Sequence, residues 1–543
     1  MLLGKSSRKL TRSSAILSFG SLDFTPLQLF SITSFCATGF FCPCFRNCEN
    51  AANLPDFAPA RRGSDGVTMH SLPIMPRHIL IPLIVACALF MENMDSTVLA
   101  TSLPAIAKDI GEDPLALKLA FTSYLVSLAV FIPISGWVAD RYGSRTIFAA
   151  AIIVFMCGSL LCAASSALAA FVLARFVQGI GGAMMVPVGR LVLLKTVPKS
   201  GLVAALNYLT IPALLGPIIG PPLGGLITQY FNWRGIFLIN VPIGIIGFVL
   251  VLRHIPNIRE AEMPSLDLRG FVLMGFGLSA LMLGLSALGG HLISGPVTAT
   301  CIVIGAIAVT GYGWHSKRIA DPVIDLGLLK FATFRAGVIG GSLFRIGVGA
   351  TPFLLPLMFQ LGFGLDPFHS GLLTCATAAG AMLMKTLTIK ILKGFGFRRV
   401  MTVNAVLASA AVGVYGLFTA DTPHLLVIVI LLLSGCLRSL QFTSLSAISF
   451  AEISRQTMSQ ASSVQSMTQR LSQSLGVVIG AYALQISSNL QGHSTIVTAD
   501  FWPAFLVVAA ISAASVVFNL ALPPDAGVEI SGKARKAEET PPS

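Results

Sequence analysis

Two carboxylates interrupt an otherwise apolar stretch between residues 79 and 104. Glu92 and Asp95 are three positions apart, so a helix would present both on one side, about one turn from each other. Burial disfavours the ionised form of a carboxyl group, whereas a neighbouring guanidinium favours it. An acid that is hydrated in one conformation and paired in another can therefore load and release a proton. The alternative is a permanent ion pair that only holds two helices together.

A basic counterpart occurs in the sequence RFVQGIGG at 175–182. A cation, an amide and two glycines share one helix face there, at i, i+3, i+4 and i+7: Arg175, Gln178, Gly179 and Gly182. If this helix crosses a bilayer, an arginine near its middle costs roughly 2.5 to 3.5 kcal/mol, so its face should turn toward a partner or a hydrated cavity. The alternative is a structural arginine whose guanidinium reaches back to the membrane surface.

Further polar residues fall inside apolar stretches of the second half, where with Gln178 they could line a substrate cavity: Arg345, Lys385, Arg438, Gln441 and Gln469. Arg345 lies in the segment that corresponds, by internal repeat, to the one with Glu92 and Asp95. We therefore expect Arg345 to face these acids across a central cavity. Gln469 belongs to a polar ridge with helical spacing, beside Arg470. Because these cations outnumber the acids, neutral or anionic amphiphiles fit better than lipophilic polycations.

Signals for metal or nucleotide chemistry are weak. Four cysteines cluster near the start without the paired CxxC units of common zinc sites: Cys36, Cys42, Cys44 and Cys48. No GxxxxGK[ST] sequence occurs, so ATP is not expected as an energy source within this chain. The expectation is no metal, no cofactor and no enzymatic activity, with an ion gradient as the driving force.

Composition shows what kind of element must position these residues. Hydrophobic residues make up 54% of the 543 and charged residues 11%, and the mean hydropathy is +0.81, so the surrounding solvent must be lipid. A spanning helix needs roughly 20 apolar residues, and such stretches recur almost end to end. The net charge of +13 lies in the short gaps between them, where it marks topology and not nucleic-acid binding.

The apolar stretches predict an all-α polytopic membrane protein with about fourteen transmembrane helices. The chain divides into an N-terminal extension, a six-helix half, two extra helices, a second six-helix half and a cytoplasmic tail: 1–76, 77–253, 254–320, 321–522 and 523–543. The predicted spans are 79–104, 116–139, 146–168, 171–194, 203–228, 236–252, 270–288, 296–314, 336–360, 371–391, 400–419, 425–446, 462–486 and 502–522.

Lysine and arginine in the loops predict the orientation of these spans. Lys108, Lys118 and Arg234 lie on one side. Far more lie on the other: Arg141, Arg145, Lys195, Lys199, Arg253, Arg259, Arg269, Lys317, Arg318, Lys330, Arg335, Lys390, Lys393, Arg398, Arg399 and Arg455. By the positive-inside rule, both termini are cytoplasmic. Residues 1–76 lack helical periodicity, and Met69 and Met75 lie just before the first predicted span, which suggests a wrongly assigned start codon or, as the alternative, a signal peptide.

Two glycine-containing segments stand out, one after the second predicted span and one inside the fifth. The loop GWVADRYGSR at 136–145 is weakly repeated as KGFGFRR at 393–399, as expected for two related halves. In GPIIGPPLGG at 216–225, glycines recur every four residues and make one smooth face on which another helix can pack closely. The prolines of this segment bend the helix. Its role is either gating at the interface of the halves or tight packing alone.

These segments resemble motifs of the major facilitator superfamily. The loop at 136–145 is similar to the cytoplasmic signature loop, RFVQGIGG to the fourth-helix motif and 216–225 to the fifth-helix antiporter motif. With MDSTVLATSLPAIA at 94–107 and WRGIFLINVPIG at 233–244, the resemblance narrows to the 14-helix drug:proton antiporter branch. It covers roughly residues 77 to 522; Gly235 replaces the aromatic that this branch usually carries.

The resemblance implies roles for particular residues. Arg175 is implicated in proton coupling, with Glu92 and Asp95 as the leading proton carriers. The loop is expected to act as a latch of the inner gate, through Gly136, Asp140, Arg141, Gly143 and Arg145; Asp140 is expected to attract a neighbouring helix N-terminus. The antiporter motif is expected to seal the interface between the halves, through Gly216, Pro217, Gly220, Gly224 and Gly225.

The expected function is proton-coupled antiport that exports amphiphilic small molecules or drugs by alternating access. The partners are then substrate, protons and membrane lipid, with no nucleic acid and with any periplasmic adaptor unknown. The expected location is the bacterial cytoplasmic (inner) membrane. Two alternatives remain: a dedicated organic-anion or metabolite exporter of the same fold, and a non-transporting membrane sensor or scaffold.

Overall fold

The computed structural model describes residues 77–527 except 198–201, 261–264, 290–292, 320, 455–456, 494 and 524–525. The predicted N-terminal extension and nearly all of the predicted tail lie outside the described residues, as do Lys199 and Arg455. The described part of the chain consists of helices and their connections, without a strand. The predicted all-α polytopic membrane fold is confirmed.

The first half contains six spans. Five are single helices, and the sixth is split into α6 and α7: α1 (Arg77–Ile110), α2 (Lys118–Tyr142), α3 (Ser144–Ala164), α4 (Leu168–Thr196), α5 (Leu202–Tyr230), α6 (Gly235–Leu238) and α7 (Asn240–His254). Two central helices follow, α8 (Leu268–Ala287) and α9 (Gly295–Ser316). They pack on each other, and α8 also packs on α2.

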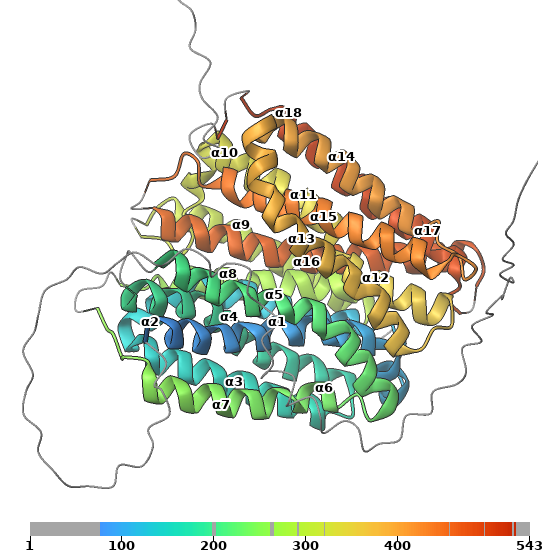
Figure 1. Ribbon diagram of the computed structural model, residues 1–543, viewed down its shortest axis with the longest axis horizontal. Helices are drawn as coiled ribbons and strands as arrows, with labels where there is room; N and C mark the ends of the chain where they lie inside the picture. Colours follow the sequence, from blue (N-terminus) through green and yellow to red (C-terminus); the bar gives the residue numbers. More distant parts are fainter. Residues whose placement is uncertain are drawn as a thin grey trace, which may run out of the picture. The chain divides into compact units, whose positions relative to one another are not determined.

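The second half repeats the six-span pattern. Its first span is a series of short segments: η3 (Leu326–Lys330), α10 (Ala332–Arg335), η4 (Ala336–Gly340), α11 (Gly341–Gly349), α12 (Thr351–Leu357) and η5 (Met358–Gly362). The rest are α13 (Pro367–Phe395), α14 (Phe397–Tyr415), α15 (His424–Ser449), α16 (Met458–Leu490), and α17 (Thr498–Ala513) with α18 (Ser515–Leu520). In Figure 1 the blue-to-green helices of the first half form one layer and the orange-to-red helices of the second half form another.

Two of the predicted spans are present but are not regular α-helices throughout. The sixth breaks at Ile239, and the ninth contains the π-helical segments η4 and η5 between its α-helical pieces. Apolar composition continues through these breaks, so hydropathy did not indicate them. Such π-helical turns are rare and occur often at functional sites.

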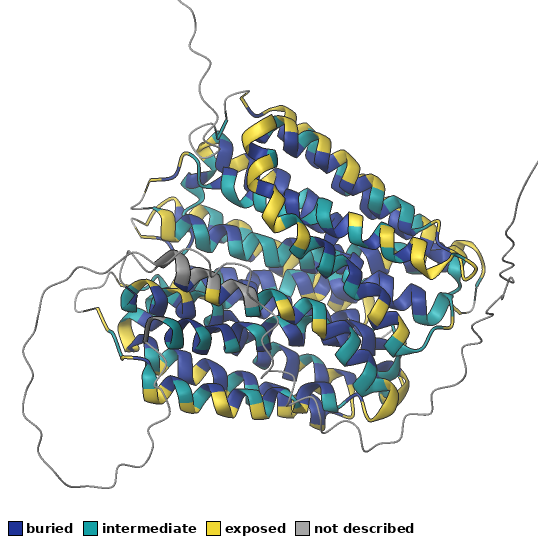
Figure 2. Cartoon of the chain, viewed as in Figure 1, coloured by how far each residue is buried: buried dark blue, intermediate teal, exposed yellow. Residues whose placement is uncertain are grey.

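Apolar side chains cover the outside of the bundle. Among the described residues, twelve segments are long and apolar enough to cross a membrane, and α5 and α16, of 29 and 33 residues, pack among them. Large apolar residues on the outer helices are exposed, for example Leu173, Ile307 and Leu425, at 67%, 67% and 73%. Figure 2 shows this exposed surface along the outer helices and buried residues between them. Such a surface is stable in contact with lipid.

The halves meet along two helix pairs, α2 with α16 and α5 with α13. A cluster of buried apolar residues from α2, α8 and α16, which includes Val130, Leu278 and Val464, covers the first contact. The second contact includes close backbone approaches at the end of the bundle opposite the start of α1 and the end of α18, which we call the distal end. There a Cβ on Gly225 would collide with the Pro367 carbonyl, and one on Gly371 with the Pro221 carbonyl. These glycines let two backbones touch.

Candidate functional site

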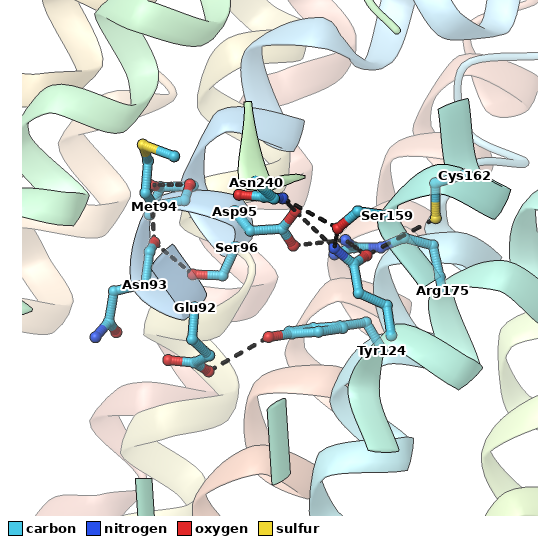
Figure 3. Close-up of polar contacts among 12 residues, drawn as sticks. Glu92, Asn93, Met94, Asp95, Ser96, Tyr124, Ser159, Cys162, Arg175 and Asn240 are labelled. Atoms are coloured by element: carbon cyan, nitrogen blue, oxygen red, sulfur yellow. Dashed lines mark hydrogen bonds and ion pairs between the residues drawn. The ribbon is translucent and has the colours of Figure 1, made fainter. Parts of the chain in front are cut away.

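Asp95 lies at the centre of a buried polar cluster in the first half (Figure 3). Its Oδ2 is 2.7 Å from Arg175 Nη1, and its Oδ1 accepts hydrogen bonds from Gln178 Nε2 at 2.9 Å and Asn240 Nδ2 at 2.8 Å. Both amides also donate to Ser159 Oγ, at 2.8 and 3.2 Å. Four spans, α1, α3, α4 and α7, thus supply one carboxylate and the groups that stabilise its charge.

Arg175 is held on several sides. Its Nη1 also donates to Gln178 Oε1 at 2.6 Å, and its Cζ lies 4.3 Å from the centre of the Tyr124 ring and 5.8 Å from that of Phe237. The residue is 1% exposed, so the guanidinium is inside the protein and does not reach the membrane surface. The helical spacing of Arg175 and Gln178 correctly placed both on one inward face.

Glu92 forms a second buried pair, one turn from Asp95. Its Oε1 is 3.2 Å from Arg470 Nη2 on α16 and accepts a hydrogen bond from Tyr124 Oη at 3.4 Å. Its Oε2 has no hydrogen-bond partner within the described part of the chain. Since α1 and α16 belong to different halves, this is the one ion pair among the described residues that joins the two six-helix halves.

Tyr124 of α2 connects the two acid and arginine pairs. Its ring stacks on Arg175 while its hydroxyl points to Glu92, as Figure 3 shows. The phenol is 1% exposed. A change in the charge of Glu92 therefore acts directly on a side chain that touches the Asp95 pair.

The predicted pairing of Arg345 with the acids of α1 was wrong. Arg345 is completely buried in the second half, where Nη1 donates to the Gly337 carbonyl at 3.4 Å and Cζ lies 5.7 Å from the centre of the Phe442 ring. The acids are paired instead by Arg175 and Arg470. Pseudosymmetry between the halves correctly matched the first spans, but it did not predict the partner of Glu92. That partner is Arg470, because α16 is the helix that reaches α1 at the level of Glu92.

The other expected cavity residues lie in the second half without forming one cluster with the acids. Gln441 Oε1 accepts a hydrogen bond from Asn404 Nδ2 at 2.9 Å, and Arg438 lines a small pocket with Tyr415 and Ser434. Lys385 is exposed, and its Nζ lies 3.5 Å from Thr443 Oγ1. Gln469 is half-buried on α16, one position before Arg470.

Three residues at the acid cluster were not predicted: Tyr124, Ser159 and Asn240. Each is a polar residue within an apolar span. Such residues also occur where helices simply pack together, so the sequence did not mark them as functional. Asn240 lies within the segment WRGIFLINVPIG, which was used only to recognise the family. Among the described residues, no group of three His, Cys, Asp or Glu side chains could hold a metal ion.

Comparison with known proteins identifies the family of this chain. The family model described as Major Facilitator Superfamily matches residues 85–328 and 337–542. The chain belongs to the Major Facilitator Superfamily. A Klebsiella pneumoniae (strain 342) protein named "Putative multidrug resistance protein MdtD" is 38% identical over 449 residues, 82% of this chain and 94% of that protein. A Yersinia pestis (strain Pestoides F) protein of the same name is 37% identical over 452 residues, 82% of this chain and 96% of that protein.

Solved structures of superfamily members share the fold at low identity. The POT family transporter PepTSo matches with a TM-score of 0.63 at 14% identity, over 82% of this chain and 97% of its own. The human organic anion transporter MFSD10 (TETRAN) matches with a TM-score of 0.55 at 14% identity, over 82% of this chain and 100% of its own. The predicted superfamily is thus confirmed, and the MdtD relatives support its multidrug efflux branch.

The superfamily signature loop ties together elements of the first half. Lys195 Nζ, at the end of α4, bonds Asp140 Oδ1 at 2.7 Å and Glu260 Oε1 at 2.6 Å, and Ser144 N donates to the Ile258 carbonyl at 3.0 Å. Asp140 therefore pairs with a lysine at a helix C-terminus, and the expectation that it attracts a helix N-terminus was wrong. The turn needs Gly143, whose φ is 102°.

The rest of the loop stays near the surface. Arg141 is exposed and Arg145 half-buried, and a Cβ on Gly136 would meet no atom within 4 Å. The proposed latch residues thus surround an ion-pair network that holds α2, α4 and the chain after α7 together. Whether this network opens and closes a gate stays a prediction.

The superfamily antiporter motif packs α5 against α1. A Cβ on Gly216 would lie 3.0 Å from Met94 N and one on Gly224 2.7 Å from the Val98 carbonyl oxygen, while one on Gly220 would collide with Thr97 Oγ1. Gly225 faces α13 of the other half instead. The motif, which includes Pro217 inside α5, therefore serves both the packing of the first half and its contact with the second.

Proposed function

We propose that this transporter is a proton-coupled antiporter that exports amphiphilic small molecules or drugs by alternating access. One observation carries the proposal: two carboxylates lie on adjacent turns of α1 inside the membrane region, each bonded to an arginine, and the Glu92 pair spans both halves. Ionisable residues at this depth are costly and generally functional.

The two acids have different surroundings and therefore different roles. Asp95 accepts bonds from Arg175, Gln178 and Asn240, all of the first half, so this carboxylate is strongly stabilised as an anion. Glu92 has one arginine partner and a carboxylate oxygen without a bond. We therefore assign to Glu92 the proton that enters from outside while the halves are apart at this level and is released to the inside when Arg470 pairs with the carboxylate.

A proton on Glu92 removes the negative charge that holds Arg470. The interaction becomes a hydrogen bond to a neutral acid, so the link between the halves weakens and they can rock apart at the level of α1 and α16. The hydroxyl of Tyr124 is then free to reorient, and its ring lies on Arg175. Exposure of Asp95 and its own protonation follow in the second stage of the cycle.

The structure is closed at the distal end, where α5 and α13 meet through Gly225 and Gly371 and where Gln360 Nε2 donates to the Thr101 carbonyl at 2.9 Å. With both termini in the cytoplasm of a bacterium, as the loop charges predict, this end faces outward. In the proposed cycle, this end stays closed while substrate is loaded from the inside of the cytoplasmic membrane. Membrane lipid surrounds the bundle, and neither a nucleic acid nor an adaptor protein is part of the proposal.

The test is substrate-induced proton movement in everted vesicles. Vesicles with the parent, Glu92→Gln or Asp95→Asn are energised, and a pH-sensitive dye reports proton flow when amphiphilic anions, neutral dyes or cations are added. Asp421→Asn, a charge loss at an exposed loop residue, is the matched control. Compounds that collapse the gradient with the parent and the control only would support the proposal.

Other outcomes discriminate the alternatives. Full transport by both acid-to-amide variants would contradict the role of the acids and favour another coupling ion, with sodium tested next. Absence of any proton or substrate movement by correctly inserted parent protein would favour a sensor or scaffold. A response limited to one class of metabolite would indicate a dedicated exporter.

A further inference from the structure

The fourth span of each half carries the same pair of polar residues. Arg175 and Gln178 on α4 correspond to Arg438 and Gln441 on α15, each pair three positions apart. In the first half, the arginine meets Asp95 from the first span. In the second half, the first span offers the cation Arg345 in place of an acid. The second half therefore has the cationic part of the site without its anion.

A pocket lies at the equivalent place in the second half. It is about the size of one water molecule and lies between the first, second, third and fourth spans, with polar lining from Thr351, Thr377, Tyr415, Ser434 and Arg438. The cluster around Asp95 likewise draws on the first, third and fourth spans of its half, through α1, α3 and α4. The pocket and the Asp95 cluster thus share the first, third and fourth spans of their halves, while the cluster adds Asn240 of the sixth span and the pocket adds Thr377 of the second.

Donor groups around this pocket lack partners. Within the described part of the chain, no carboxylate pairs with Arg438 and no hydrogen bond to its guanidinium is found. Thr351 Oγ1 is buried without a hydrogen bond, and so are Nε and Nη2 of Arg345. Arg345 lies outside the pocket lining, over the ring of Phe442, which is four positions after Arg438 on α15. Buried charges without a counter-charge are strongly disfavoured.

We propose that this pocket binds the anionic group of the transported substrate, an amphiphilic organic carboxylate whose apolar body extends beyond the pocket. The inference rests on the proposed transport function and adds the substrate class and the residue that recognises it, Arg438. The substrate carboxylate supplies in the second half the negative charge that Asp95 supplies in the first. The pocket is about the size of one water molecule, so it can take only the acid group, and the ring must lie outside it.

Equilibrium binding tests the inference without any proton movement. The full-length protein in lipid nanodiscs is titrated with three probes that share one apolar ring system: 2-naphthoate, 2-naphthamide and 2-naphthylmethylammonium. Empty nanodiscs correct for partition into lipid. The parent is expected to bind the carboxylate roughly tenfold or more tighter than the amide, because a buried charge pair replaces a neutral contact.

Variants locate the binding site. Arg438→Gln should remove the preference for the carboxylate, while Arg438→Lys, which keeps the charge, should retain part of it. Arg269→Gln removes one charge at an exposed residue of α8 and should bind like the parent. Thermal unfolding of each variant shows whether it is folded, and 2-naphthamide binding shows whether its apolar site is intact.

Three results would overturn the inference: equal binding of carboxylate and amide by the parent, an unchanged preference in Arg438→Gln, or stabilisation by chloride alone with no preference among the probes. The last result would identify an inorganic anion site. Loss of proton coupling with retained carboxylate binding would refute the proposed antiport and leave this site standing, so the two proposals fail separately.

Discussion

The ion pair between Glu92 and Arg470 makes the sharpest prediction, because it joins the two halves inside the membrane region. Its atoms are 3.2 Å apart, with the Glu92 side chain 1% and the Arg470 side chain 21% exposed. At an effective dielectric constant near 20, the attraction is about 5 kcal/mol before desolvation. Desolvation offsets much of this, and contacting pairs show coupling energies of about 0.5–3 kcal/mol.

A coupling of 1–3 kcal/mol changes a conformational equilibrium roughly 5- to 150-fold. Glu92→Gln and Arg470→Gln should each shift the population away from the distal-closed state by that factor. The double variant should shift it no further than the larger single effect. In the parent, acidification should produce the same shift as Glu92→Gln, since both remove one negative charge, and Glu92→Gln should no longer respond to pH in this way.

Distances between spin labels measure this population. Labels at Glu112 and Asp421, in connections at the distal ends of the first and second halves, report opening of that end after replacement of the native cysteines. Lys330→Gln, which removes one exposed charge, is the control for Arg470→Gln. Additive effects of the two single variants, or identical distance distributions in all proteins, would refute the idea that this pair stabilises the distal-closed state.

Three further predictions concern the first half and the distal end. Asp95→Asn leaves Arg175 buried without a counter-charge and should lower the free energy of unfolding by about 3–5 kcal/mol, measured by denaturant titration in detergent; a loss below 1 kcal/mol would contradict the pair. Gly224→Ala places a Cβ 2.7 Å from the Val98 carbonyl oxygen and should cost about 1–3 kcal/mol, whereas Gly295→Ala, with no atom within 4 Å, should leave the melting temperature unchanged. Asp366→Ala removes the N-cap of α13 and should cost about 1 kcal/mol. Burial opposes ionisation of Asp366, but hydrogen bonds from His369 hold its pKa below the usual range. The contribution of this cap to stability is therefore complete above pH about 3.9 and is lost as the pH falls through the folded pKa. Equal melting temperatures of the parent and the variant at pH 7 would contradict this prediction.

The fold was predictable because lipid imposes one requirement on every span. About 20 apolar residues must satisfy their backbone bonds within a helix, so composition alone located the spans. The breaks at Ile239 and in η4 and η5 were not predictable, because they leave that composition unchanged. They depend on how neighbouring spans pack, which no local pattern records.

The candidate site was predictable only where chemistry and spacing lie within one helix. Arg175 with Gln178, and Glu92 with Asp95, were each placed on one face by helical period. The partner of Glu92 was not, because α1 and α16 are 378 residues apart at the bonded pair. In the sequence, Arg470 stood out only as a neighbour of the polar ridge. Its position gave no reason to prefer it to Arg345 as the partner of Glu92.

The two halves share a fold but differ in charge, and this difference suits a transporter that exchanges two ligands. The first half holds its own anion, Asp95, against Arg175, so the only species that can neutralise that carboxylate from outside is a cation as small as a proton. The second half holds Arg438 without an anion, so it can accept a negative group from a larger molecule. Glu92 and Arg470 join the halves, so a proton on Glu92 changes how strongly the halves are held together.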